Sequence, residues 1–384
     1  MSDIAKKIEE LSKTYSTIDE PDFIRTGSIV LDALLGGGVP RGAFLLWSSG
    51  SGIGKSTATL HICRSYCAQG LKVLYLDYEG GVNENQLKGI GLSEHKFDAE
   101  KNPTGGFFIF RVHTFMDGED ILKCLLDEVD LVVFDSVTAM LPGKMDEGSV
   151  EDYNIGVQAR LMGNLLRKYK AKTIKSGASW IMINQTRMKI NFIAQTVEEE
   201  AGGQALKFYS DYRIMMKEAK NGRLEKEEET AKGVVKVPYG STNEIWCTKS
   251  RFVRPFIPMN LTIVYGRGVS NIHAYKDFLE YKGIIRKPSK KATKYEVELE
   301  PGNVIKLYDK EIVDYLKSNG ERVKELVKEF GGYRLLMNKE SDVIPEYVSD
   351  DDEGLPFDET AGEPSEETVE ESTDNIEEGD GEEE

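Results

Sequence analysis

Short apolar runs alternate with amphipathic stretches between residue 26 and about residue 265. The early runs are unbroken rather than alternating with polar residues, which is typical of strands that are covered on both faces in a parallel sheet. The pattern therefore predicts an α/β fold with a mostly parallel central sheet. The predicted strands are 43–47, 72–76, 106–111, 131–134, 180–184, 212–216, 241–247 and 260–265.

The flanking segments have other patterns. Residues 3–14 predict a short amphipathic helix, and residues 217–237 are so highly charged that we expect an exposed excursion. Since about 340 residues exceed one typical core, two domains are expected before the tail. The predicted division is an N-terminal helix and linker (1–25), a core (26–269), a small α+β domain (270–338) and a tail (339–384).

Charge is distributed unevenly along the chain. The net charge is −17, but residues 340–384 hold 21 acidic residues and no Lys or Arg. The remaining 49 basic and 45 acidic residues leave +4 on residues 1–339, so the acidic total does not exclude a nucleic-acid-binding protein. A run of like charges with few large apolar residues cannot form a core, and the tail is predicted to be disordered.

Other patterns bear on the compartment. No apolar run approaches the roughly 20 residues of a membrane span, and the polar first ten residues do not resemble a signal peptide. Cys63 and Cys67 share a helix face but lack a second Cys/His pair nearby, so we interpret them as buried thiols rather than metal ligands. We expect a cytoplasmic protein with no membrane partner.

The strongest local signal is the segment WSSGSGIGKST at residues 47–57, which follows a predicted strand and opens a helix. This is the setting of a phosphate-binding P-loop, where glycines let backbone N–H groups turn towards phosphate oxygens. Lys55 would neutralise the β- and γ-phosphates, and Ser56 would bind Mg²⁺. The pattern has Gly where Ser49 stands. The predicted nucleotide-binding residues are Ser49, Gly50, Ser51, Gly52, Ile53, Gly54, Lys55, Ser56, Thr57 and Asp135.

Three polar residues end the neighbouring strands. Asp135 follows the run LVVF and is predicted to hold Mg²⁺ together with Ser56. Glu79 follows another strand and could deprotonate the attacking water, although Asp77 is a competing candidate. Gln185 ends a third strand and could sense the γ-phosphate. Each carboxylate could instead cap a helix or face solvent.

In their order along the chain, these motifs resemble the bacterial RecA recombinases. The segment FDSVTAMLP (134–142) resembles the family's Walker B segment, and TGSIVLD (26–32) resembles the segment before its P-loop. NQTRMKI (184–190) and GGQALKFY (202–209) resemble the borders of its second DNA-binding loop. The likeness covers residues 24–270 and is weaker beyond, in position and character only. It implies a RecA-like P-loop ATPase core.

The resemblance implies an ATP-dependent recombinase that forms a filament on single-stranded DNA, exchanges strands with duplex DNA and hydrolyses ATP with Mg²⁺. A single-strand-binding protein is a further possible partner. Loop one (145–156) and loop two (186–203) would contact DNA. Lys249 and Arg251 would reach the neighbouring protomer's nucleotide, while Lys207 and Phe208 would lie at that interface. The implied DNA-binding residues are Ile155, Arg160, Arg167, Arg187, Lys189, Ile190, Gly202 and Gly203.

The chain also departs from the family pattern. Gln86 lies near the place of an aromatic ring that stacks on adenine in many members, and Glu244 and Trp246 stand where the family tends to have cations for a second DNA strand. The N-terminal arm, which normally docks on the next protomer, is short. These departures favour a divergent member, such as one encoded by a phage.

Two other functions fit part of the pattern. A hexameric helicase-like or KaiC-like ring would share the P-loop and Asp135, but it would not need Arg187–Ile190 followed by two glycines. An ATP-gated coat on single-stranded DNA would also share the loops, and would lack homology-dependent pairing.

Overall fold

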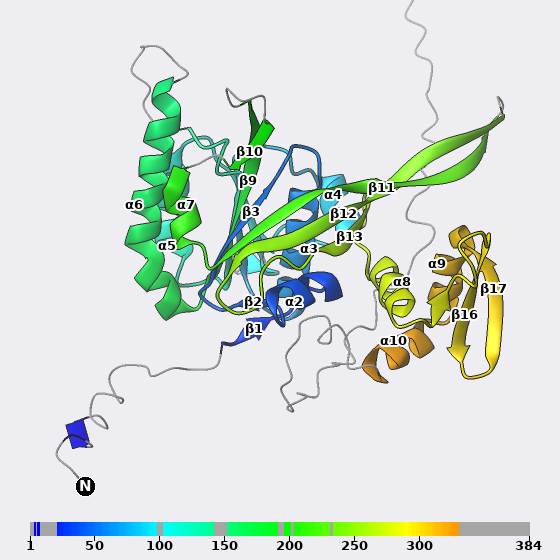
Figure 1. Ribbon diagram of the computed structural model, residues 1–384. Coiled ribbons are helices and arrows are strands. Elements are labelled where there is room, and N and C mark those ends of the chain that lie inside the picture. Colours follow the sequence, from blue (N-terminus) through cyan, green and yellow to red (C-terminus); the bar gives the residue numbers. More distant parts are fainter. Residues whose placement is uncertain are drawn as a thin grey trace, which may run out of the picture. The chain divides into compact units, whose positions relative to one another are not determined.

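A computed structural model describes residues 21–97, 103–141, 152–190, 196–200, 203–230 and 233–329, together with residues 4, 6 and 7 (Figure 1). Residues 4, 6 and 7 are helical, but the rest of the predicted N-terminal helix and the predicted acidic tail lie outside the described residues. The side chains of 96–97, 103–104, 152–156, 187–190, 196–200 and 230 are outside them as well. Among the described helices, none is long and apolar enough to cross a membrane.

A ten-stranded sheet forms the centre of the chain, in the order β14-β13-β12-β11-β3-β9-β8-β4-β7 with β10 paired to β9. The pairs from β11 through β3, β9, β8 and β4 to β7 are all parallel. The strands are β3 (Phe44–Ser49), β4 (Val73–Asp77), β7 (Phe107–Arg111), β8 (Leu131–Asp135), β9 (Ser179–Ile190), β10 (Thr196–Glu200), β11 (Tyr212–Thr230), β12 (Gly233–Ser250), β13 (Met259–Val264) and β14 (Gly268–Val269). The predicted α/β class with a mostly parallel sheet is confirmed.

Helices cover both faces of this sheet (Figure 1). One face carries α2 (Ile29–Leu35), α3 (Lys55–Ala68) and α4 (Glu84–Ile90), and the other carries α5 (Phe115–Leu125), α6 (Asp152–Ser176) and α7 (Gly203–Tyr209). Successive side chains of one strand point to opposite faces, so Leu45 packs with the first group and Leu46 with the second. Both are almost fully buried, and each such side chain stabilises the fold by about 1.5–3 kcal/mol.

The helix ends follow from local sequence. Ser28 caps α2 by accepting the N–H of Leu31, and Gly36 ends that helix with a positive φ of 89°. Thr114 and Asp117 form a capping box at the start of α5. Two short pairs complete this part of the chain: β1 (Phe23–Ile24) with β2 (Val39–Pro40), and β5 (Lys96–Phe97) with β6 (Pro103–Thr104).

Residues 271–329 form a small α+β unit with a hydrophobic cluster of its own, which includes Phe278, Val297 and Leu316. Its elements are α8 (Asn271–Tyr281), β15 (Ile285–Arg286), β16 (Lys294–Glu300), β17 (Asn303–Tyr308), α9 (Asp309–Ser318) and α10 (Gly320–Glu329). At its start, the Asn271 side chain donates to Gly27 O across 2.9 Å and accepts the Ile29 N–H across 3.2 Å. These bonds attach α8 to the segment before α2.

Part of the implied loop two and most of the predicted excursion are paired strands. Strand β9 continues past Gln185 to Ile190, and β10 returns beside it with Thr186 opposite Glu200. Strands β11 and β12 also continue through the charged excursion as a long two-stranded ribbon, which Figure 1 shows extending beyond the rest of the sheet. Polar side chains suit such strands because both faces of a projecting hairpin are solvated. The predicted exposure of the excursion agrees with its burial pattern.

Candidate functional site

A cleft of about 220 Å³ opens at the carboxyl ends of the central parallel strands. Its lining comes from the predicted P-loop, from the turn after β4, from the end of β8 and from β9. The lining residues are Ser51, Gly52, Gly54, Lys55, Ser56, Thr57, Glu79, Asp135, Ile183 and Gln185. Ligands of open α/β sheets bind at this edge. The structure thus brings the residues predicted from three separate strands together around one cavity.

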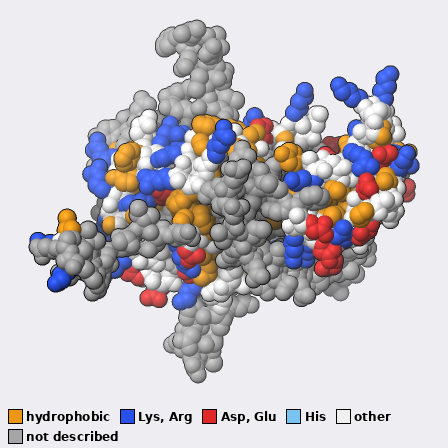
Figure 2. All heavy atoms as spheres, turned by 60° about the horizontal axis from the view of Figure 1, so that its bottom comes forward, with side chains coloured by type: hydrophobic (Ala, Val, Ile, Leu, Met, Phe, Trp, Pro, Cys, Tyr) orange, Lys and Arg blue, Asp and Glu red, His pale blue; other side chains and the backbone are white. Residues whose placement is uncertain are grey.

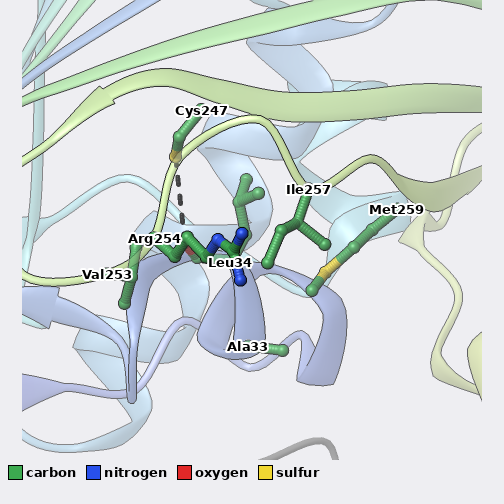
Figure 3. Close-up of a pocket in the computed structure, with 7 residues that line it drawn as sticks. All are labelled: Ala33, Leu34, Cys247, Val253, Arg254, Ile257 and Met259. Atoms are coloured by element: carbon green, nitrogen blue, oxygen red, sulfur yellow. Dashed lines mark hydrogen bonds between the residues drawn. The ribbon is translucent and has the colours of Figure 1, made fainter. Parts of the chain in front are cut away.

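A second pocket, between α2 and the segment that follows β12, is too small to be a ligand site. Figure 3 shows its seven lining residues, among them Leu34 and Cys247, whose Sγ donates a weak hydrogen bond to Leu34 O at 3.8 Å. Its volume is about 10 Å³, which is room for no more than a water molecule.

The P-loop connects β3 directly to α3. Gly52 and Gly54 have φ angles of 75° and 99°, in the region that favours glycine, and a Cβ on Gly54 would lie 2.5 Å from the Ile263 side chain. Helix α3 therefore starts at Lys55 with Gly54 as its cap, and no side chain caps its first N–H groups. Free N–H groups at the start of a 14-residue helix attract an anion such as a phosphate.

Lys55 is buried beneath this loop. Its ammonium donates to Ser49 Oγ and Gly50 O, each at 2.8 Å, and to Ser49 O at 3.2 Å. Burial lowers the pKa of Lys55, while the nearby Glu79 and Asp135 raise it. Ser49, the departure from the P-loop pattern, thus supplies a hydroxyl that holds the lysine within the loop.

Asp135 lies at the end of β8 with only 3% of its surface exposed. Its Oδ2 accepts the hydroxyl of Tyr75 at 2.5 Å, while its Oδ1 is buried and has no hydrogen-bond partner among the described residues. Burial raises the pKa of Asp135, and the bonds from Tyr75 and Ser56 oppose that shift. A buried carboxylate oxygen with a hydroxyl nearby suits Mg²⁺, which takes one or two protein ligands and completes its shell with phosphates and water. The residues therefore fit a Mg²⁺ ion held by Ser56 and Asp135.

Glu79 lies across the cleft, just after β4. Its Oε1 accepts Nε2 of Gln185 at 3.0 Å and the hydroxyl of Ser136. Asp77, the competing candidate base, is 1% exposed and uses both oxygens to accept the N–H groups of Gly80 and Val82. Asp77 thus holds the turn that carries Glu79, and Glu79 is the carboxylate that faces the cleft.

Lys249 and Arg251 lie at the opposite end of the sheet from the P-loop. In the strand register, Lys249 of β12 lies opposite Arg213 of β11, which lies beside Leu46 of β3. Arg251 forms an ion pair with Asp211 at 3.2 Å, beside the start of β3. Roughly 16 Å of strand separates that start from the P-loop. Lys249 also donates to Lys207 O and Phe208 O at 3.0 and 2.9 Å. Lys249 therefore caps the end of α7, Arg251 is held by Asp211, and neither lines its own chain's cleft.

Comparison with known proteins agrees with this arrangement. A family model described as the RecA N-terminal domain matches residues 7–270. Protein RecA of Synechococcus elongatus is 30% identical over 264 residues, which cover 69% of each chain. Protein RecA of Frankia casuarinae is 32% identical over 267 residues, covering 69% of this chain and 72% of that protein, and Protein RecA of Trichodesmium erythraeum is 27% identical over 308 residues, covering 80% and 79%.

The chain belongs to the RecA family. At about 30% identity it is a divergent member. The matched range includes the whole P-loop cleft and the Lys249–Arg251 pair, and ends just before α8.

The described residues among those that the resemblance implies for DNA binding lie on three elements, α6, α7 and β9. Arg160 and Arg167 are exposed on α6. Gly203 begins α7 with a φ of 79°, and a Cβ there would lie 2.6 Å from Ala159 Cβ, so α6 and α7 approach closely at this glycine. Arg187, Lys189 and Ile190 lie in β9 and Ile155 in α6, but their side chains, like all of Gly202 and most of loop one, are outside the described residues.

Sequence reasoning missed three contributors to the site. Tyr75 was counted only as part of a buried strand, and Ser136 only as part of the Walker B motif. Gln158 donates from α6 to Val137 O and to Met140 O, the latter at 3.4 Å, and so ties the helix after loop one to the turn after Asp135. Hydroxyl and amide groups within apolar runs or helices give no periodic signal, so only the tertiary structure identifies them.

Proposed function

We propose that this RecA-family chain is an ATP-dependent recombinase that assembles as a helical filament on single-stranded DNA, pairs it with homologous duplex and exchanges strands. The observation that carries the proposal is the hydrogen bond between Glu79 and Gln185 at the mouth of the P-loop cleft. It joins the candidate base for hydrolysis to the first residues of the hairpin that would contact DNA.

In the proposed reaction, the P-loop N–H groups and Lys55 bind the phosphates of ATP. Lys55 would exchange its bonds to Ser49 and Gly50 for bonds to phosphate oxygens. Mg²⁺ held by Ser56 and Asp135 would neutralise phosphate charge when bound. Glu79 orients the attacking water and takes its proton, which requires that the carboxylate be turned from Gln185 and Ser136 towards the γ-phosphate.

Gln185 is the proposed link to DNA. When its amide turns to the γ-phosphate, it releases Glu79 and moves the start of the hairpin formed by β9 and β10. A ligand shifts such an equilibrium only by contacts that differ between its two states, and the γ-phosphate supplies such a contact. ATP would thereby favour the state that grips DNA, and hydrolysis would release it.

DNA contact is assigned to the hairpin and α6. On the face drawn in Figure 2, Lys and Arg side chains are interspersed with acidic and hydrophobic ones over the described residues. Arg160, Arg167, Arg187 and Lys189 would bind phosphates without reading sequence, and Ile155 and Ile190 could separate neighbouring bases. The N–H groups of Gly202 and Gly203 would approach the strand closely.

Filament assembly is proposed because the cations Lys249 and Arg251 lie far from their own cleft. Placed against a neighbour's nucleotide, they would stabilise charge on its γ-phosphate as arginine fingers do. The exposed ring of Phe208, beside the carbonyls that Lys249 caps, would lie at the same junction.

Electron microscopy with ATP and single-stranded DNA tests the assembly. The proposal expects extended helical filaments and ATP hydrolysis that increases on addition of single-stranded DNA. Closed rings would favour a helicase-like or KaiC-like motor instead. The absence of both rings and filaments would overturn the proposed assembly.

One contact favours the alternative of a DNA coat without strand exchange. Lys217, in the region where the family tends to have cations for a second DNA strand, bonds Glu244 at 3.1 Å and lies 5.1 Å from the centre of the Trp246 ring. Part of its charge is therefore neutralised. Homology-dependent pairing separates the two functions, because a coat alone would lack it.

A further inference from the structure

Tyr75 and Asp135 connect two neighbouring strands beneath the cleft. Strands β4 and β8 are parallel, with Tyr75 beside Val133 and Asp77 beside Asp135. The Tyr75 side chain is fully buried, and its ring packs against Phe107 with the ring centres 5.9 Å apart. From this fixed position, its hydroxyl donates to Asp135 Oδ2 across 2.5 Å. Such a short O···O separation is typical of a hydroxyl bonded to a charged carboxylate.

The hydrogen bond from Tyr75 occupies one oxygen of the Asp135 carboxylate, and the other oxygen remains available for a metal ion. Oδ1 of Asp135 is buried without a hydrogen-bond partner among the described residues, and the carboxylate lines the cleft together with Ser56. Rotation about the last side-chain bond of an aspartate is soft, so nothing intrinsic to Asp135 fixes the plane of its carboxylate. The bond from the Tyr75 hydroxyl fixes that plane, and with it the direction of the second oxygen.

We propose that Tyr75 is a positioning residue for the metal site: it holds Oδ2 of Asp135 so that Oδ1 is presented to Mg²⁺ beside Ser56. The inference rests on the proposed function, because it assumes that the cleft binds a Mg²⁺–nucleotide complex. Partners that orient a metal ligand in this way commonly change metal affinity by 10- to 100-fold when they are removed.

A simpler explanation is that a buried tyrosine merely finds an acceptor for its hydroxyl. In that case, Tyr75→Phe would lower thermal stability without changing metal binding. A positioning role instead predicts weaker metal binding whatever the effect on stability. The Phe ring keeps the packing against Phe107, so the variant is expected to fold.

The matched control is Tyr66→Phe. Tyr66 is also fully buried in the same hydrophobic cluster, and among the described residues its hydroxyl makes no bond to Asp135. Both variants remove one buried hydroxyl, so a general packing effect would appear in each.

The test measures Mn²⁺ binding by electron paramagnetic resonance in the presence of ADP, so that no turnover is needed. Binding of a fluorescent ADP analogue without metal and a melting curve monitor the fold. The expected result is about tenfold weaker Mn²⁺ binding for Tyr75→Phe, with unchanged metal-free ADP binding and wild-type behaviour of Tyr66→Phe. Mn²⁺ affinity within twofold of wild type for Tyr75→Phe, or the same loss in Tyr66→Phe, would overturn the inference. Absence of Mn²⁺–nucleotide binding by the wild-type protein would instead overturn the proposed function.

Discussion

Gln185 donates a hydrogen bond from its side-chain amide to Oε1 of Glu79 across 3.0 Å, although Gln185 lies within β9, Glu79 follows β4, and β8 separates these two strands. The bond occupies one oxygen of the candidate base and ties it to the strand that continues into the β9–β10 hairpin. In the proposed function, this amide would link hydrolysis to DNA contact.

Replacing Glu79 with Gln should abolish most ATP hydrolysis while ATP binding persists. The amide keeps the size and hydrogen-bonding reach of the carboxylate but cannot accept the proton, so turnover should fall by about 10²–10⁴-fold. Steady-state hydrolysis and nucleotide binding measure the two effects separately. Glu84→Gln, on the exposed start of α4, is the control and should behave as wild type. Normal turnover by Glu79→Gln would assign the base elsewhere.

Replacing Gln185 with Ala should make the rate of ATP hydrolysis independent of single-stranded DNA. The variant keeps Lys55, Asp135 and Glu79, so basal hydrolysis without DNA should remain within a few-fold of wild type. Stimulation by single-stranded DNA should be lost, because the amide that joins the cleft to the hairpin is gone. Hydrolysis rates with and without DNA give the answer. Full stimulation of the Ala variant would show that the signal takes another route.

The fold was largely predictable from the sequence, because unbroken apolar runs and a P-loop at a strand–helix junction identify a parallel α/β sheet. The hairpins were not. Thr186–Ile190 and residues 217–237 are rich in polar or charged residues and contain no unbroken apolar run, and their strand structure depends on pairing with partners such as Thr196–Glu200. For the described part of residues 217–237, the charged composition indicated the exposure correctly but not the strand structure.

The candidate site also combines residues that the sequence predicts with a contact that it does not. Lys55 begins α3 and Asp135 ends β8, while Glu79 and Gln185 each follow an apolar run, so sequence order places all four at one edge of the sheet. The bond from Tyr75 to Asp135 depends instead on the register of β4 beside β8, which periodicity does not specify.

Lys249 and Arg251 should act on the neighbouring protomer. Arg251→Ala is expected to lose most DNA-dependent hydrolysis, whereas Arg254→Ala, three residues away, should not. Mixing Arg251→Ala with the inactive Lys55→Ala protein should restore part of the activity. A Lys55→Ala protomer keeps its own Arg251, which can act on the intact cleft of a neighbouring Arg251→Ala protomer. Hydrolysis measured across mixing ratios should pass through a maximum. Absence of any recovery would contradict action between protomers.

Deleting residues 340–384 should tighten binding to duplex DNA and reduce its Mg²⁺ requirement. The deletion removes 21 negative charges that can compete with DNA phosphates for the cations of residues 1–339. Screening by salt or Mg²⁺ weakens that competition. Filter binding or fluorescence anisotropy over a Mg²⁺ series measures both effects. Unchanged affinity together with unchanged Mg²⁺ dependence would refute a regulatory tail.

Acidification should destabilise the fold through one buried and one half-buried histidine. Burial lowers the pKa of His61 and of His273 to about 4, below the ordinary 6.5, so the unfolded chain binds protons that the folded chain does not between those values. The free energy of unfolding should therefore fall as the pH drops through this window, by up to about 1.4 kcal/mol per pH unit for each histidine. Denaturant unfolding at pH 7 and 5.5 measures the change, and His61→Gln should reduce it. An identical pH dependence in that variant would show that His61 does not contribute.

The most direct test of the account is strand exchange between a circular single strand and a homologous linear duplex, with and without a single-strand-binding protein. Joint molecules should form with ATP and Mg²⁺, should require homology, and should be absent with Lys55→Ala. If the wild-type protein binds single-stranded DNA well with ATP but forms no joint molecules in either condition, the proposed recombinase function is contradicted.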